Sequence, residues 1–168
     1  DEEGMARTAE RKVQVARRIH DLAVTTHGLR PEDLIFDPLT FTLATGETEY
    51  QDSATETMEA IRRIHAELKG VHTSLGISNV SFGLQPQARA VLNSVFLHHC
   101  VDAGLTMAMV NPVEIKPYPD IHREQRALAD DLIFHRRPDA LDRFIAYFQG
   151  RTSEEAATAD PTERMEPG

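Results

Sequence analysis

The chain has 168 residues, of which 40% are hydrophobic, and this is enough for one domain with a sizeable core. Its net charge of -9 excludes a nucleic-acid groove, which needs clustered Lys and Arg, and does not favour an anionic membrane surface as partner. No apolar run approaches the roughly 20 residues of a membrane span. The single cysteine, Cys100, excludes an internal disulfide framework and predicts a cytoplasmic location.

Helices and short apolar strands are expected to alternate along the chain. The first helix is predicted over residues 7–27, with Val13, Ala16 and Ile19 facing inward. A strand follows at 34–36, where a continuous apolar run is typical of a strand buried on both faces. The next predicted elements are a helix at 52–68, a strand at 71–77, a helix at 86–103 and a strand at 105–110. Helices at 122–135 and from 138 complete residues 1–150 as one domain, and residues 151–168 read as a disordered tail or interdomain linker.

Polar residues stand just beyond each of the three predicted strands. They are Asp37, the pair Ser78 and Asn79, and Asn111. Repeated strand and helix units imply parallel strands, and in a (β/α)8 barrel the loops after the strands build the active site. Because a full barrel takes about 250 residues, the sequence predicts an α/β fold with about half of a TIM-type barrel. The polar strand ends are expected to converge on one ligand.

The stretch from Gly76 to Gly83 carries the most distinctive chemistry. Ser78, Asn79 and Ser81 offer hydrogen-bond donors and acceptors, but no nucleophile with an activating base. Such side chains are better suited to hydrogen-bonding the edge of a polar heterocyclic ligand than to catalysing hydrolysis. The alternative is a polar loop that makes its own turn bonds and caps the next helix.

Four segments resemble the folate (pterin-binding) domain of cobalamin-dependent methionine synthases: residues 35–38, 73–83, 91–99 and 107–112. The resemblance implies a TIM-type barrel of the dihydropteroate-synthase-like type, of which this chain would be the C-terminal half. The partners it implies are the N-terminal half of that barrel and a cobalamin-binding module of the same enzyme. In that family the barrel binds 5-methyltetrahydrofolate, whose methyl group passes to cobalamin held by another module and on to homocysteine in methionine synthesis.

The resemblance also implies roles for individual residues. Asp37 would accept hydrogen bonds from the amino and ring N–H groups of the pterin, in keeping with the strength of charge-assisted bonds. Asn79 would act near N5 by orientation and transition-state hydrogen bonding, since an amide is a weak acid. The remaining pocket residues implied by the resemblance are Gly76, Ser78, Ser81, Asn111 and Asp1.

One departure from the family pattern and two alternatives accompany this interpretation. Some family members carry an Arg just after the motif, whereas here the nearest is Arg89, inside the predicted helix. A dihydropteroate synthase would need a basic residue where Asn79 stands. A non-catalytic, truncated remnant or assembly module is the other alternative, motivated by the missing strands.

No metal site is predicted. His98, His99 and Cys100 are consecutive, and adjacent helix positions point about 100° apart, so the three side chains are not expected to face one ion. Cys100 is expected to be a buried, small apolar residue.

Overall fold

A computed structural model describes the backbone of residues 4–158 and the side chains of residues 4–150. It contains five α-helices, α1 (Ala9–Asp21), α2 (Ser53–Glu67), α3 (Pro86–Asp102), α4 (Arg123–Ile133) and α5 (Ala140–Thr158), and three strands, β1 (Ile35–Phe36), β2 (His72–Gly76) and β3 (Met107–Met109). Every predicted helix and strand is therefore present. No helix of the described part is long and apolar enough to cross a membrane.

Local sequence explains where the helices begin. Thr8 caps α1 by accepting a hydrogen bond from the backbone N–H of Arg11 at 3.2 Å. Pro86 occupies the first turn of α3, where its missing N–H costs no intrahelical bond. The end of α1 continues as a π-helical turn, Leu22–Thr26.

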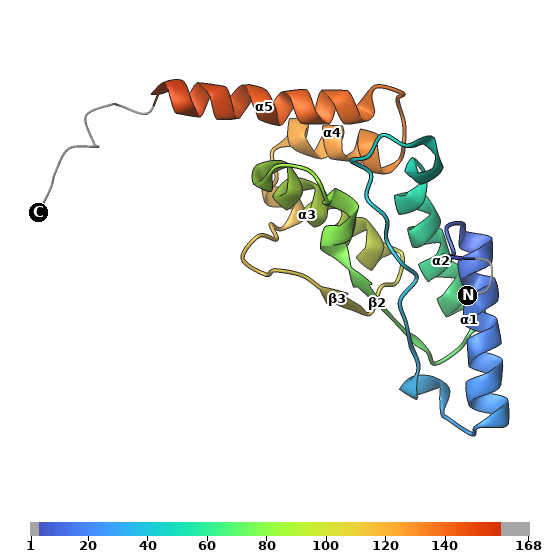
Figure 1. Ribbon diagram of the computed structural model, residues 1–168. Helices are drawn as coiled ribbons and strands as arrows, with labels where there is room; N and C mark the ends of the chain where they lie inside the picture. Colours follow the sequence, from blue (N-terminus) through green and yellow to red (C-terminus); the bar gives the residue numbers. More distant parts are fainter. Residues whose placement is uncertain (1–3, 159–168) are drawn as a thin grey trace, which may run out of the picture.

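The strands form one parallel sheet in the order β1-β2-β3. Phe36 pairs with Thr73, and Gly76 pairs with Met109. Helices α2 and α3 make the two crossovers, as Figure 1 shows. The predicted α/β class with parallel strands is thus confirmed, and the carboxyl ends of β2 and β3 lie at the same edge.

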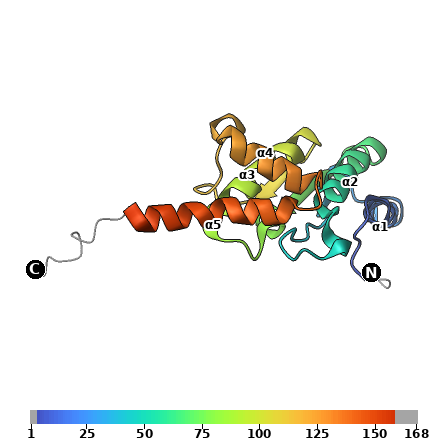
Figure 2. The ribbon, with the colours of Figure 1, turned by 90° about the horizontal axis from the view of Figure 1, so that it is seen from above.

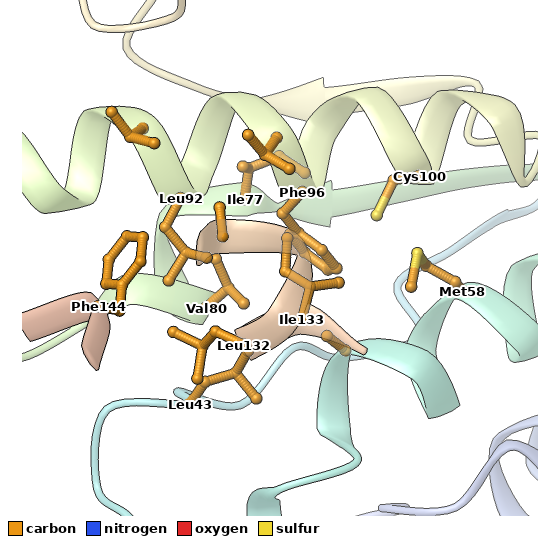
Figure 3. Close-up of a cluster of buried hydrophobic side chains, with 14 of the residues drawn as sticks. Leu43, Met58, Ile77, Val80, Leu92, Phe96, Cys100, Leu132, Ile133 and Phe144 are labelled. Carbon is orange, nitrogen blue, oxygen red and sulfur yellow. The ribbon is translucent and has the colours of Figure 1, made fainter. Parts of the chain in front are cut away.

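The main core lies between α3 and the helices packed on it (Figure 3). Phe96 and Leu92 of α3 are fully buried, as are Ile77 after β2, Ile133 of α4 and Phe144 of α5. Figures 1 and 2 both place α5 alongside α4 and α1 beside α2. A second cluster joins α1, α2 and β1. Burial of each large apolar side chain stabilises the fold by about 1.5–3 kcal/mol.

The prediction that the first strand is buried on both faces is wrong for this chain. Ile35 is 57% exposed, and in β3 Met107 and Met109 are 38% and 61% exposed. The pairing puts Ile35, Met107 and Met109 on the same face of the sheet, and no helix of the described part buries them there. In β3 the opposite face is exposed as well, since all three of its residues are exposed. Ile19, predicted to face inward, is also 48% exposed, because α1 packs on α2 through Val13 and Ala16, which lie nearer the start of the helix.

The C-terminal helix continues beyond the predicted domain boundary at residue 150. Helix α5 runs through Gly150 to Thr158. The rest of the predicted tail, residues 159–168, lies outside the described residues, and so does the predicted pocket residue Asp1.

Candidate functional site at the strand ends

The Asn79 amide lies against the backbone of Gly76, where β2 ends. A Cβ atom on Gly76 would lie 3.1 Å from Nδ2 of Asn79 and 4.0 Å from Cε of Met109. The glycine therefore leaves room for the amide to fold back against the end of β2. Asn79 is exposed, and within residues 4–150 its side chain has no hydrogen-bond partner, so both amide groups are available to a ligand.

Ser81, two residues further on, faces inward and holds the loop together. It is fully buried, its Oγ donates to the carbonyl oxygen of Ser78 at 3.2 Å, and it accepts from Nε of Arg89 at 3.3 Å. The loop is also fixed from the preceding segment, since Thr42 Oγ1 donates to the Phe82 carbonyl oxygen at 2.7 Å. Ser81 is thus placed to orient Ser78 and Arg89 more directly than to contact a ligand.

A cleft of about 540 Å³ opens beside this loop, between the ends of β2 and β3 and the start of α3. It brings together two of the predicted residues, Ser78 and Asn111. Its lining residues are Ile77, Ser78, Pro86, Arg89, Asn93, Met109, Val110, Asn111, Glu114 and Ile115. Donors, acceptors and one charge of each sign therefore face a space large enough for a small heterocyclic ligand.

Asn111 lines the cleft but also forms a turn. Its Nδ2 donates to Oε1 of Glu114 at 2.8 Å, and its Oδ1 accepts from the backbone N–H of Val113 at 3.3 Å. The amide is therefore already engaged by its own loop.

Three polar lining residues were not among the predicted site residues: Arg89, Asn93 and Glu114. Asn93 is only 4% exposed, and its Oδ1 has no hydrogen-bond partner in the described part of the chain. A polar residue on the apolar inner face of the helix, between Leu92 and Val95, was the sequence signal that could have identified it.

Asp37 does not line this cleft. The pairing of Phe36 with Thr73 places Asp37 at the level of Ser74, two residues before β2 ends, which corresponds to about 7 Å along the strand. Its Oδ1 accepts the backbone N–H of Leu39 at 2.9 Å, and the residue borders a separate hollow of about 100 Å³ next to Lys12. The described chain thus brings Ser78 and Asn111 together but leaves Asp37 in the neighbouring hollow.

The histidine pair on α3 lies away from both hollows. Cys100 is fully buried, as predicted, and burial raises the pKa of its thiol. The group of ligand atoms that does form here contains Asp102 and not Cys100: those of His98, His99 and Asp102 lie within 4.8 Å of one another. His99 Nε2 is already 2.7 Å from Oδ1 of Asp130, so this group has a structural partner.

Known proteins resemble this chain along most of its length. The profile of the family described as pterin binding enzyme matches residues 1–111. A methionine synthase of Mycobacterium tuberculosis (strain ATCC 25618 / H37Rv) is 46% identical over 153 residues, which are 89% of this chain and 13% of that protein. A methionine synthase of Mycobacterium leprae (strain TN) is 45% identical over 156 residues, 91% of this chain and again 13% of the relative. The chain thus spans about an eighth of the length of these curated relatives.

Proposed function

Because this chain belongs to the pterin-binding enzyme family, we propose that it binds 5-methyltetrahydrofolate as part of a cobalamin-dependent methionine synthase. The resemblance to methionine synthases expected from the sequence motifs is confirmed by the two mycobacterial relatives. The observation that carries the proposal is the Asn79 amide at the end of β2, which has no hydrogen-bond partner among the described side chains and belongs to the loop beside the cleft that Ser78 and Asn111 line.

The proposed chemistry is methyl transfer from N5 of the folate. Asn79 would hydrogen-bond the pterin near N5 and orient it, and this bond would strengthen as the amine becomes the leaving group. The chemistry that cobalamin, held by another module, would supply when bound is acceptance of the methyl group and its delivery to homocysteine. Asp37 would accept two N–H bonds from the pterin edge, since a carboxylate binds paired donors strongly.

Arg89 supplies the cation that the motif itself lacks. It reaches the cleft from the first turns of α3, and the bond from its Nε to Ser81 fixes its direction. We assign it to the anionic tail of the folate, and we assign Ser81 to positioning Arg89. We assign Gly76 to the site because its missing side chain leaves space for the Asn79 amide.

The exposed side of the sheet supports a partial barrel. Ile35, Met107 and Met109 present apolar surface there, which is the side that the N-terminal half of a barrel would cover. In this proposal that half completes the pocket, and Asp37 and Asn79 then face one ligand.

Replacement of Asn79 in the complete enzyme tests the proposal. Asn79→Ala should slow methyl transfer from 5-methyltetrahydrofolate to cobalamin about 100-fold, the effect of removing one transition-state hydrogen bond. Gln85→Ala is the matched control, because Gln85 stands at the start of α3 and its side chain makes no capping bond. A wild-type rate in Asn79→Ala would rule out the catalytic role.

The same exposed sheet face favours a second candidate, a non-catalytic assembly module. In that case two copies of the chain would cover each other's Ile35 and Met109. Sedimentation of the chain distinguishes the two functions: a compact, cooperatively melting dimer without affinity for 5-methyltetrahydrofolate would favour the assembly module.

A further inference from the structure

Lys12 belongs to α1, yet its ammonium group lies beneath the loop that follows β1. The residue is only 4% exposed. Its Nζ donates to the carbonyl oxygens of Pro38 and Leu39, both at 2.7 Å, and to Oγ1 of Thr57 at 3.0 Å. An ammonium carries three N–H groups, so each of them has an acceptor.

The loop that Lys12 holds has an unfavourable backbone conformation. Leu39 has φ of 59°, in the left-handed region that residues with a side chain seldom adopt. Such a conformation persists only where neighbouring contacts fix it. Lys12 binds two carbonyl groups that flank this conformation: that of Pro38, directly before Leu39, and that of Leu39 itself.

One peptide group connects Lys12 to Asp37. The carbonyl oxygen of Pro38 and the N–H of Leu39 belong to the same planar unit. Lys12 binds the oxygen at 2.7 Å, and Oδ1 of Asp37 accepts the N–H at 2.9 Å. Fixing the plane of this peptide therefore fixes the direction of the bond that holds the carboxylate.

We propose that Lys12 is a positioning residue for pterin binding, which acts through the Pro38–Leu39 peptide to hold the Asp37 carboxylate in its ligand-binding orientation. The inference rests on the proposed ligand role of Asp37.

Burying an ammonium group at this position is unfavourable, and filling the space would not by itself need a charged side chain. Burial lowers the pKa of Lys12 to about 8, and the nearby carboxylates of Glu56 and Asp37 raise it. A Met side chain would fill similar space without burying an ammonium. The three hydrogen bonds are what distinguish lysine here. Thr57 Oγ1 independently donates to the Leu39 carbonyl oxygen at 2.8 Å, so the bond to Pro38 is the contact that most depends on Lys12.

A double-mutant cycle tests the relay. The dissociation constant for 5-methyltetrahydrofolate is measured by calorimetry in the complete enzyme for the wild type, Lys12→Met, Asp37→Ala and the double variant. Lys12→Met should weaken binding about tenfold, the order expected for one lost hydrogen bond. The double variant should bind no more weakly than Asp37→Ala, because residues acting as one unit are not additive. Lys69→Met, which replaces an exposed lysine, should bind as the wild type does.

Each outcome has a distinct meaning. Wild-type affinity in Lys12→Met overturns the inference, and so do fully additive effects, which would indicate general destabilisation. Wild-type affinity in Asp37→Ala instead refutes the proposed ligand role of Asp37. If Lys12→Met does not fold, Thr57→Val removes the hydroxyl that binds both Lys12 and Leu39 while keeping its shape. It should weaken binding less than tenfold in the wild type and not at all in Asp37→Ala, and unchanged affinity in both backgrounds overturns the relay.

Discussion

Gly76→Ala should impair the candidate site without unfolding the chain. The added methyl group would lie 3.1 Å from Nδ2 of Asn79, whereas ordinary contacts of this kind lie at about 3.5–4 Å. The amide must therefore move by a few tenths of an ångström or leave its position over β2. Gly76 has φ of -78° and ψ of 90°, so its backbone accepts alanine without strain.

The expected effect on function follows from that displacement. A misplacement of about 1 Å in a reacting group costs on the order of 100-fold, so a shift of a few tenths of an ångström should reduce methyl transfer about tenfold. The free energy of unfolding should change by less than about 1 kcal/mol, because the Gly to Ala change also reduces the entropy of the unfolded chain.

Two measurements check this expectation: the rate of methyl transfer from 5-methyltetrahydrofolate in the complete enzyme, and urea unfolding of the chain. Gly150→Ala is the control, because nothing lies within 4 Å of a Cβ atom there. A wild-type rate in Gly76→Ala would refute the role assigned to the Asn79 amide, and a loss of stability matching the loss of rate would show that the glycine serves folding alone.

Three further predictions concern stability and reactivity. Phe96→Ala should lower the free energy of unfolding in urea by about 3–5 kcal/mol, since Phe96 is fully buried, whereas Phe82→Ala, at 70% exposed, should change it little. Because burial raises the pKa of the Cys100 thiol, iodoacetamide at pH 8 should label the folded chain far more slowly than the chain in urea, and equal rates would contradict that burial. The pKa of Lys12 falls to about 8 in the folded chain against 10.5 for the free side chain. Between these values the unfolded chain binds more protons at this lysine, so Lys12 should add to the free energy of unfolding a contribution that rises with pH, by at most about 3 kcal/mol. The raised pKa of Cys100 acts in the opposite direction, so the difference between the wild type and Lys12→Met is the quantity to compare. Lys12→Met should lack this rise in pH-dependent urea titrations.

Periodicity was sufficient to locate the elements because each helix buries a continuous apolar stripe. The apolar stripe of Met58, Ile61 and Ile64 predicted the position of α2, and Val95 and Phe96 predicted that of α3. The failures came where burial depends on what lies opposite. Ile19 and Ile35 have the same hydrophobicity as buried residues, yet no helix of the described chain covers them.

The same distinction, between what the sequence predicts and what packing decides, applies to the candidate site. Residue types and their order along the chain predicted Asp37, Ser78, Asn79 and Asn111 as candidates, because polar residues after parallel strands lie toward one edge of a sheet. The register of the strands could not be read from the sequence. That register puts Ser78 beside Asn111 and leaves Asp37 level with Ser74, two residues before the end of β2.

Contacts between distant segments came from packing alone. Lys12 is 26 positions from Pro38 and 45 from Thr57, and no local pattern links them. The inward turn of Ser81 toward Arg89 likewise depends on how α3 packs against the loop. Local sequence set the helices, the strands and the polar strand ends, because those depend on neighbours a few residues away. The tertiary structure set which polar groups share a hollow and which hold a loop, because those depend on chain segments that only folding brings into contact.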